Sequence, residues 1–345
     1  MQPYVKKLDV FVRTGIWFFS WDGRATAPEI YPEETKKEFR ESHETMLAHC
    51  KRYENELMGL FNIMLTHDDH HGDAQRNIRK KLAKRMSEYI KDPRLVQGFT
   101  PQFSVGCKRI APGDTYMDAI QKPNVEVHFT GVQSVIEDGL VGDDGSVTKV
   151  DTIVCATGFN VSHIPRFPII GLNGADLGKK WAVIPEGYYG LACPEFPNYI
   201  IFQGPTWPVE NGSVMGPLQQ VVSYAIQIIK KMQNENIKYW VPRQDVTDEF
   251  NKHAQSWFKG TVWEEDCNAW YKDRKTGIVT AVWPGSGLHY MEAISEPRYE
   301  DMDIKYHGQN RFAHLGLGFV ERDLDKNMDK SPYLDLKFLD PRYYE

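Results

Sequence analysis

Two short basic segments are the parts of the sequence best suited to bind an anion. Lys108 and Arg109 are adjacent cations that follow Gly106 in a stretch of apolar and small residues. Arg13 follows the alternating segment 8–12, and an arginine just past the second strand of a Rossmann unit can bind the 2′-phosphate of NADP. An ordinary surface cation at a strand end is the favoured interpretation of each position on the residues alone, and the anion site is the alternative.

A glycine that follows an apolar segment marks another candidate site. The segment 150–155 predicts a buried strand, and it continues into Ala156, Thr157, Gly158 and Phe159. Gly158 would allow the main chain to approach a ligand closely. A tight turn without a functional role is the alternative.

Other clusters do not match a catalytic or metal-binding spacing. The sequence contains no G-x-S-x-G and no G-x-x-x-x-G-K-[ST] motif, and Gly316-Leu317-Gly318 has Glu321 at the position of the third glycine of a dinucleotide fingerprint. One acidic and histidine-rich cluster has metal-binding residue types, but it lacks the H-E-x-x-H order, and a solvated loop between helices is favoured. Its members are His67, Asp68, Asp69, His70, His71 and Asp73. We predict no metal site.

A basic helix face is the only local feature that suggests nucleic acid. Its cations are Arg76, Arg79, Lys80, Lys81, Lys84 and Arg85. Stacking aromatics are not interleaved with them, so a solvated face is favoured and nucleic-acid binding is a minor alternative. The net charge of −6 also argues against a surface built to neutralise phosphates.

Length and composition describe the scaffold that must position these residues. A chain of 345 residues, 41% apolar and 26% charged, has room for two domains or for one large α/β unit with an appendage. No stretch approaches ~18 uninterrupted apolar residues and no signal-peptide pattern is present, so we expect no membrane span. The five widely spaced cysteines, an odd number, predict reduced thiols and a cytoplasmic protein.

The apolar periodicity changes along the chain. It predicts a strand at 8–12, then a long helix from Pro32 to 64 and a second helix ending at 90, which together form a helical insertion. Strands follow at 125–129 and 132–136, with a glycine-rich hairpin at 142–145. A further strand is expected at 199–202, then a helix that Pro217 opens, and an ordered extension beyond 236.

Several spaced motifs occur in the order of one known family. They are Phe11-Val12-Arg13-Thr14, Gly106-Cys107-Lys108-Arg109, Ala156-Thr157-Gly158-Phe159, Phe196-Pro197-Asn198-Tyr199, Gly204-Pro205 and Trp270-Tyr271. The chain resembles flavin-dependent Baeyer–Villiger monooxygenases, most closely those of fungal secondary metabolism, from residue 3 to about 320. The resemblance implies an α/β fold, a truncated form of the flavoprotein fold with two dinucleotide-binding domains and a helical insertion at 32–95. It also implies FAD and NADPH as cofactors and a small-molecule ketone as substrate.

The resemblance assigns roles to individual residues. Arg109 matches the catalytic arginine, whose permanent positive charge stabilises anionic intermediates. Arg13, Thr14 and Lys108 match positions that hold the 2′-phosphate of NADPH. The positions that approach FAD are Ala156, Thr157, Gly158, Phe159, Gly204 and Pro205. Trp270 and Tyr271 match aromatic positions over the nicotinamide cofactor.

The same resemblance divides the chain and raises an alternative. It implies an NADPH-domain remnant at 1–120, an FAD-domain remnant at 121–235 and a C-terminal extension at 236–345. Family members carry two G-x-G-x-x-G loops upstream of the stretch that matches residue 3, and this sequence has neither. We therefore expect either a monooxygenase or a non-catalytic paralogue or incomplete gene product that acts at most as an interaction module.

Overall fold

The chain folds into short strands and longer helices joined by extended loops. A computed structural model describes residues 1–19, 31–66, 69–209, 212–273, 275–334 and 342. The helices are α1 (Glu33–Glu41), α2 (His43–Gly59), α3 (Asp69–Tyr89), α4 (Pro93–Phe99), α5 (Asp114–Ala119), α6 (Leu177–Lys180), α7 (Met215–Glu235), α8 (Gln244–Trp257), α9 (Gly287–Ala293) and α10 (Glu321–Leu324). The strands are β1 (Leu8–Phe11), β2 (Phe18–Phe19), β3 (Ala111–Pro112), β4 (Val125–His128), β5 (Val132–Ile136), β6 (Gly139–Gly142), β7 (Val147–Lys149), β8 (Ile237–Pro242) and β9 (Met302–Tyr306).

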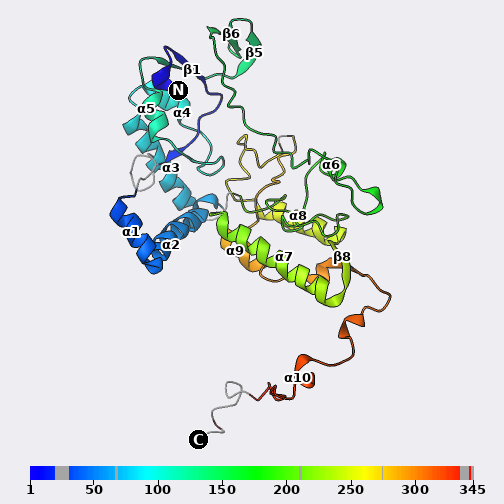
Figure 1. Cartoon of the computed structure of the whole chain (residues 1–345). Coiled ribbons are helices and arrows are strands. Elements are labelled where there is room, and N and C mark those ends of the chain that lie inside the picture. The colour runs from blue at the N-terminus through cyan, green and yellow to red at the C-terminus, as the bar shows by residue number, and fades with distance from the viewer. Residues whose placement is uncertain (20–30, 67–68, 210–211, 274, 335–341, 343–345) are drawn as a thin grey trace.

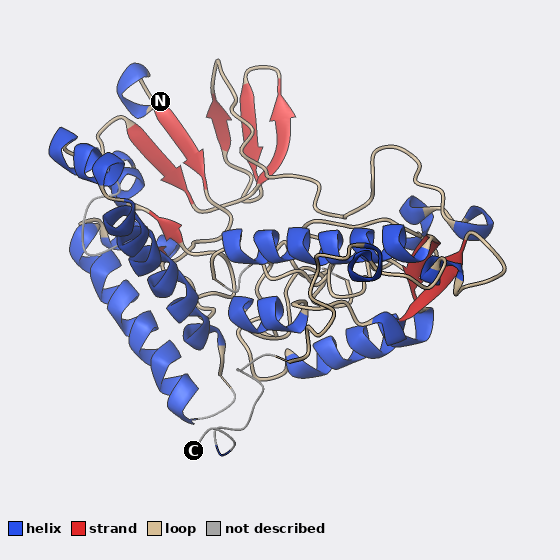
Figure 2. Cartoon of the chain, turned by 60° about the horizontal axis from the view of Figure 1, so that its bottom comes forward, coloured by secondary structure: helices blue, strands red, loops and turns tan. Residues whose placement is uncertain are grey.

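The strands form separate small sheets (Figure 2). β1 pairs with β4 and β2 pairs with β3, both in parallel. Parallel neighbours need a long crossover; the chain contains helices α1–α4 between β2 and β3, and α1–α5 between β1 and β4. The alternation at 8–12 and 125–129 is thus confirmed as a parallel pair, with Leu8 opposite Val125. β5, β6 and β7 form an antiparallel sheet, which confirms the hairpin predicted at 142–145.

The helical insertion is present, but its first helix is broken. The predicted continuous helix to 64 is instead α1 and α2, followed by a 3-10 turn at Leu60–Met64. Ser42 separates the two helices because its side chain accepts a hydrogen bond from the main-chain N–H of Thr45 at 3.2 Å. A serine in this position starts a new helix at the expense of continuing the old one.

Helix α3 begins earlier than expected and packs its apolar stripe into a core. Asp69–Asp73 belong to the helix and not to the predicted loop, while His67 and Asp68 lie outside the described residues. Met86 and Ile90 are buried in a cluster with Trp17 and Phe99. This cluster joins the helices to β2 and β4.

Three of the six cations on the basic face of α3 pair with acidic residues. Arg76 pairs with Asp73, Lys84 lies 3.7 Å from Glu88, and Arg85 pairs with the buried Asp114. These contacts use charges that a phosphate would otherwise meet. They support the interpretation of this face as structural.

Two predicted strands are wrong. Residues 151–160 are exposed and no described strand pairs with them. A strand depends on pairing and on a covered face, so an apolar segment without a neighbouring strand stays irregular. Residues 199–202 form no strand and are irregular, although the N–H of Ile201 bonds the carbonyl of Leu191 at 2.7 Å.

The C-terminal half has its own core between α7, α8, α9 and the antiparallel pair β8–β9. The helix predicted at Pro217 is confirmed as α7, which starts at Met215. Trp207, Tyr224 and Tyr290 are buried there. Beyond Tyr306 the packing ends: side chains of 308–334 are almost all exposed, and this segment leads away from the body in Figure 1.

The longest helices are amphipathic. α3 and α7 each have 21 residues, with one apolar stripe and one polar face. Within the described ranges, no helix is apolar over a length sufficient to cross a lipid bilayer.

Candidate functional site

The two predicted basic segments each precede one strand of the same parallel pair, β2–β3. Arg13 and Thr14 precede β2, and Lys108 and Arg109 precede β3. The main-chain N–H of Ala111 bonds the carbonyl of Trp17 at 3.1 Å, which fixes the register of the two strands. Because the strands are parallel, their leading segments lie at one edge. Arg13, Thr14 and Arg109 are exposed there, and Lys108 is half-buried.

A pocket of about 330 Å³ opens beside this edge. Thr14 contributes to it, but most of the wall is apolar. It is lined by Val12, Thr14, Ile16, Phe18, Phe99, Ala111, Pro112 and Tyr116. Burial raises the pKa of Tyr116, so this phenol stays protonated at neutral pH. The pocket suits a ring or another apolar group next to the basic edge.

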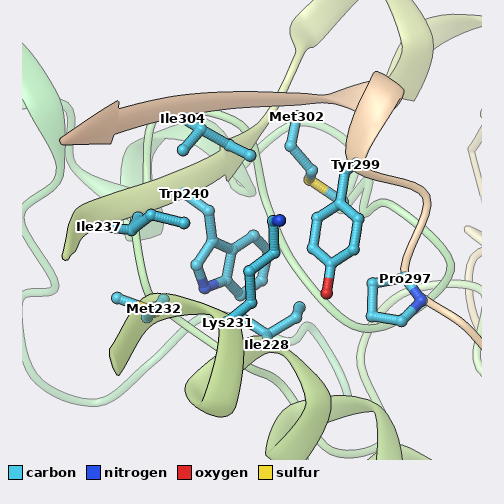
Figure 3. A pocket seen from close by; sticks show the side chains of 9 residues that line it. All are labelled: Ile228, Lys231, Met232, Ile237, Trp240, Pro297, Tyr299, Met302 and Ile304. Atoms are coloured by element: carbon cyan, nitrogen blue, oxygen red, sulfur yellow. The ribbon is translucent and has the colours of Figure 1, made fainter. Parts of the chain in front are cut away.

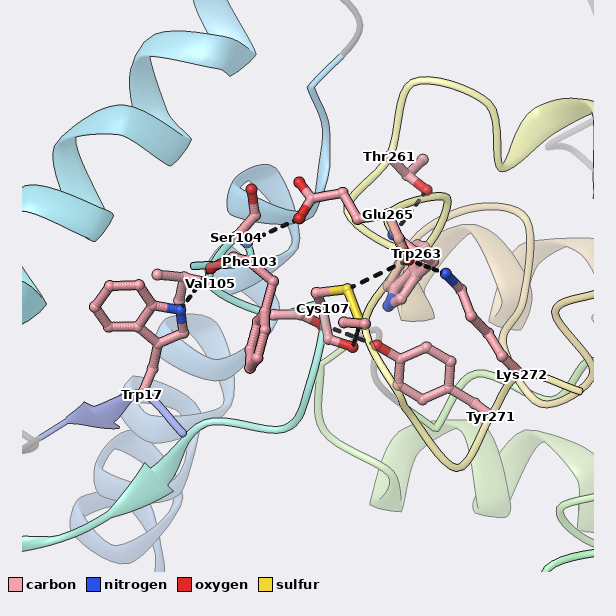
Figure 4. Close-up of a disulfide and its surroundings, with 12 residues drawn as sticks. Trp17, Phe103, Ser104, Val105, Cys107, Thr261, Trp263, Glu265, Tyr271 and Lys272 are labelled. Carbon is pink, nitrogen blue, oxygen red and sulfur yellow. Dashed lines mark hydrogen bonds between the residues drawn. A yellow bond between two sulfur atoms is a disulfide. The ribbon is translucent and has the colours of Figure 1, made fainter. Parts of the chain in front are cut away.

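A chain of hydrogen bonds connects three motifs that are far apart in the sequence. Tyr271 donates its hydroxyl to the carbonyl of Gly106 at 3.3 Å (Figure 4). The N–H of Thr280 bonds the carbonyl of Tyr271 at 2.8 Å, and the N–H of Thr206 bonds the carbonyl of Thr280 at 2.8 Å. The Gly106–Arg109 loop, the Trp270-Tyr271 pair and the segment after Gly204-Pro205 therefore form one connected unit.

The prediction that all cysteines are reduced is wrong. Cys107 and Cys267 form a disulfide across 160 residues of sequence, with a Cα–Cα distance of 6.2 Å (Figure 4). This separation is within the normal range for a disulfide. Cys50, Cys155 and Cys193 are free. Sequence spacing did not reveal the pair because only the fold brings these two segments together.

The two predicted aromatic positions differ in environment. Trp270 is 39% exposed, whereas Tyr271 is 0% exposed. Their ring centroids are 5.9 Å apart and nearly perpendicular. Trp270 is therefore open to a cofactor, while Tyr271 packs in the core with Cys267 and Val282.

The segment 156–159 is not brought to the others. Ala156, Thr157, Gly158 and Phe159 are all exposed, and Phe159 is 96% exposed. Gly158 has a φ of +93°, yet a Cβ added to it would have open space around it. The glycine conformation is as expected, but no described residue approaches it.

Gly204 and Pro205 are buried and their close approach is to protein. A Cβ on Gly204 would lie 2.7 Å from the carbonyl oxygen of Gly190. Thr206, which follows them, has a φ of 68° and is buried. A β-branched residue in this region is strained, and such strain concentrates at functional sites. No local residue pattern predicts this strained conformation.

Gln75 and Glu265 are two further residues that the motifs did not indicate. Gln75 lies on α3 and is 6% exposed, and its side-chain amide bonds both main-chain groups of Val105. Glu265 accepts the N–H of Ser104 at 2.8 Å. A glutamine on a helix and a glutamate in a loop resemble surface residues, so no sequence signal distinguishes them. Both bond the loop that carries Lys108 and Arg109.

Lysine 272 lies next to the same loop. Lys272 donates to the carbonyl of Glu265. Burial lowers the pKa of Lys272, although the neighbouring carboxylates of Asp266, Glu265 and Glu264 oppose this shift. The ammonium group therefore adds partly desolvated positive charge close to the Cys107–Cys267 link.

The residues at this end of the strand pair match some of the groups that FAD and NADPH present. Three cations and a hydroxyl at one strand edge (Arg13, Lys108, Arg109 and Thr14) have the chemistry of a phosphate site. The first turn of α7 has no acidic residue, so its positive end suits an electron-rich ring. Glycine loops that would hold a pyrophosphate are not found in this sequence. The residues thus fit the 2′-phosphate and ring of the cofactors, and not their pyrophosphates.

A second cavity is too small to bind a substrate. It measures about 10 Å³, about the space of one water molecule, and lies between α7 and the β8–β9 pair (Figure 3). Lys231 reaches over the ring of Tyr299, with its Nζ 4.7 Å from the ring centroid. Trp240 and Met302 line the other sides. This is a packing gap in the C-terminal core.

Known proteins similar to this chain are longer than it. No family model matches the chain. It is 51% identical over 353 residues to the FAD-binding monooxygenase moxY of Dothistroma septosporum, an alignment that covers 100% of this chain and 55% of that protein. It is 50% identical to the FAD-binding monooxygenase stcW of Emericella nidulans, covering 100% of this chain and 57% of that protein. A Baeyer-Villiger monooxygenase of Streptomyces coelicolor is 29% identical over 84% of this chain and 54% of its own length.

Solved structures show the same fold over most of the chain. OTEMO in complex with FAD and NADP superimposes with a TM-score of 0.70 at 21% identity, covering 88% of this chain and 62% of that one. Oxidised steroid monooxygenase bound to NADP gives a TM-score of 0.71 at 19% identity, over 88% of this chain and 63% of that one. The chain spans about half the length of the curated relatives that it matches. Over about half of their length, FAD-binding monooxygenases are therefore homologues of this chain, and it shares its fold with Baeyer–Villiger and steroid monooxygenases.

Proposed function

We propose that this polypeptide acts as an NADPH- and FAD-dependent monooxygenase. Its reaction is a Baeyer–Villiger oxygenation of a ketone in fungal secondary metabolism. The observation that carries the proposal is the connected unit of the Gly106–Arg109 loop, Tyr271 and Thr206. It joins three family motifs through hydrogen bonds and a disulfide. Such convergence is expected of a site and not of motifs that match by chance.

The charged residues have separate tasks in this proposal. Arg109 is exposed, and its guanidinium keeps its charge throughout, so it can stabilise negative charge that develops near the flavin. Lys108, Arg13 and Thr14 bind the 2′-phosphate of NADPH from the edge of the β2–β3 pair. When bound, FAD supplies the redox chemistry and the activation of dioxygen.

Apolar and backbone groups place the rings. Trp270 stacks on the nicotinamide, since it is the exposed member of its pair. Ala156–Phe159, which are exposed, and Gly204-Pro205, which pack against Gly190, are assigned to the FAD side by the family resemblance. The NADPH side is assigned to 1–120, the FAD side to 121–235, and the remaining residues, 236–345, complete the site with Trp270. We assign the protein to the cytoplasm, where NADPH is available.

A flavin-binding measurement tests the proposal directly. The purified chain is incubated with FAD, freed of unbound FAD by gel filtration, and its visible absorption spectrum is recorded. We expect a bound, yellow flavin, and dioxygen consumption with NADPH and a panel of ketones. A colourless protein would refute monooxygenase activity for this chain.

A second candidate function is that of a non-catalytic interaction module. Exposed apolar side chains along 153–170 favour it, because contiguous exposed apolar surface marks interaction sites. They include Val154, Phe159, Phe167 and Ile170, which are 60, 96, 67 and 60% exposed. Under this alternative the chain binds no flavin. Substituting Phe159 and Phe167 by serine should then abolish its association with a partner protein, measured by analytical ultracentrifugation.

A further inference from the structure

The loop that carries Lys108 and Arg109 is held by bonds to its main chain from distant segments. The amide of Gln75 pairs with Val105 twice: its Nε2 donates to the carbonyl at 2.9 Å, and its Oε1 accepts the N–H at 2.9 Å. The same Nε2 donates to the carbonyl of Ile63 at 2.6 Å. Gln75 therefore ties the loop to α3 and to the turn before it.

Further anchors reach the loop from both halves of the chain. Trp17 donates its Nε1 to the carbonyl of Phe103 at 3.0 Å, and Glu265 accepts the N–H of Ser104 at 2.8 Å. The disulfide joins Cys107, the residue just before Lys108, to Cys267, three residues before Trp270. Both cysteines are buried, at 0 and 5% exposed. Figure 4 shows these groups around the loop.

We propose that Gln75 and the Cys107–Cys267 disulfide are positioning residues that fix Arg109 relative to Trp270. The inference rests on the proposed function for the role of Arg109, but the anchoring itself does not. An exposed side chain on a loop acts on a reacting group only if its main chain is held still, and a displacement of about 1 Å can cost about 10²-fold in rate. The buried main-chain bonds supply that rigidity here.

The chemistry of the anchors is specific. Val105 presents one donor and one acceptor in a buried environment, and among side chains of this length only an uncharged amide satisfies both. Leaving either group unpaired costs more than the bond gains, so the loop follows the position of Gln75. The disulfide adds a link that thermal motion does not open. Through Gln75, the helical insertion therefore helps to position the loop that carries Arg109.

The experiment compares Gln75→Met with Gln255→Met. Gln255 makes the same two bonds to Val279, with distances of 2.8 and 3.1 Å, so it is a matched control whose amide bonds a different segment and not the loop. Hydrogen exchange of the peptides covering 103–110 is measured by mass spectrometry in both variants and in Cys107→Ser/Cys267→Ser. We expect exchange in 103–110 to be faster by about tenfold or more in Gln75→Met and in the cysteine variant, and unchanged in Gln255→Met.

Two further readouts complete the test. Peptide mapping after alkylation without reductant is expected to recover Cys107 and Cys267 as one linked peptide. Recovery of both as alkylated thiols would overturn the disulfide part.

In the flavin-loaded enzyme, kcat is expected to fall about 10- to 100-fold in Gln75→Met with KM for NADPH within about twofold. Equal exchange of 103–110 in the two glutamine variants would overturn the proposal even for an active enzyme. Failure to bind flavin would refute the proposed function and leave the exchange result to decide the anchoring.

Discussion

The adjacent aromatics Trp270 and Tyr271 offer a sharp test of how the site is built. We predict that alanine at 271 destabilises the protein and that alanine at 270 weakens NADPH binding without unfolding it. The reason is their burial: Tyr271 is 0% exposed, and Trp270 is 39% exposed. The family resemblance treats the two positions alike, so their separation is a prediction of the structure.

The magnitudes follow from the contacts that each side chain makes. Removing the fully buried ring of Tyr271 should lower the free energy of unfolding by about 3–5 kcal/mol, as for other buried aromatics. Tyr271→Phe keeps the ring and loses one neutral hydrogen bond of 3.3 Å to Gly106, which should cost about 1 kcal/mol. Trp270→Ala should cost about 1–3 kcal/mol of unfolding free energy, less than Tyr271→Ala, because 39% of the indole is already exposed. The lost stacking should raise the Kd for NADPH about five- to thirtyfold, which corresponds to about 1–2 kcal/mol.

The assay pairs guanidinium unfolding followed by circular dichroism with NADPH titration by calorimetry. Each variant is measured in both, with Tyr271→Phe as the control that keeps the ring. If Tyr271→Ala were as stable as the parent chain, the packing argument would be refuted. If Trp270→Ala bound NADPH as tightly as the parent chain, the contact assigned to the exposed indole would be refuted, and the packing argument would stand.

Three other predictions concern single residues. Arg109→Ala should lower kcat about 10²- to 10³-fold while NADPH affinity falls less than about threefold, and Arg109→Lys should recover only part of the rate; parallel loss of kcat and NADPH affinity in steady-state and binding assays would contradict its role. Burial raises the pKa of the Cys193 thiol to about 12; the unfolded chain loses this proton near pH 9, so the folded state binds more protons and stability should fall between about pH 9 and 12. Cys193→Ala should reduce that alkaline loss in unfolding titrations, and an unaltered pH profile would be evidence against it. Tyr188→Phe removes a buried 2.7 Å hydrogen bond to Asp301. Because the bond is to a carboxylate, the free energy of unfolding in chemical denaturation should fall by about 1.5–3 kcal/mol. A change below about 0.5 kcal/mol would show that the bond is not formed in solution.

Local residue patterns were sufficient to predict several helices and strands. Apolar spacing predicted α3 and α7, alternation predicted β1 and β4, and glycines at 142 and 145 predicted the β6–β7 hairpin. These features depend on periods of two or 3.6 residues, which are visible within a short window. The family motifs could also be recognised from the sequence, because they are short strings in a fixed order and their contacts need not be known.

The contacts between those motifs could not be predicted before the fold was known. The segment 150–155 has the composition of a buried strand, but no described strand pairs with it, and it is exposed. The spacing of Cys107 and Cys267 predicted isolated thiols, but the fold places their Cα atoms 6.2 Å apart. Gln75 looked like one polar residue on a helix, yet it is buried and bonded to the loop of the candidate catalytic arginine. Pairing of strands, disulfides and side-chain bonds to a remote main chain depend on which segments become neighbours, and no local pattern of residue types encodes that choice.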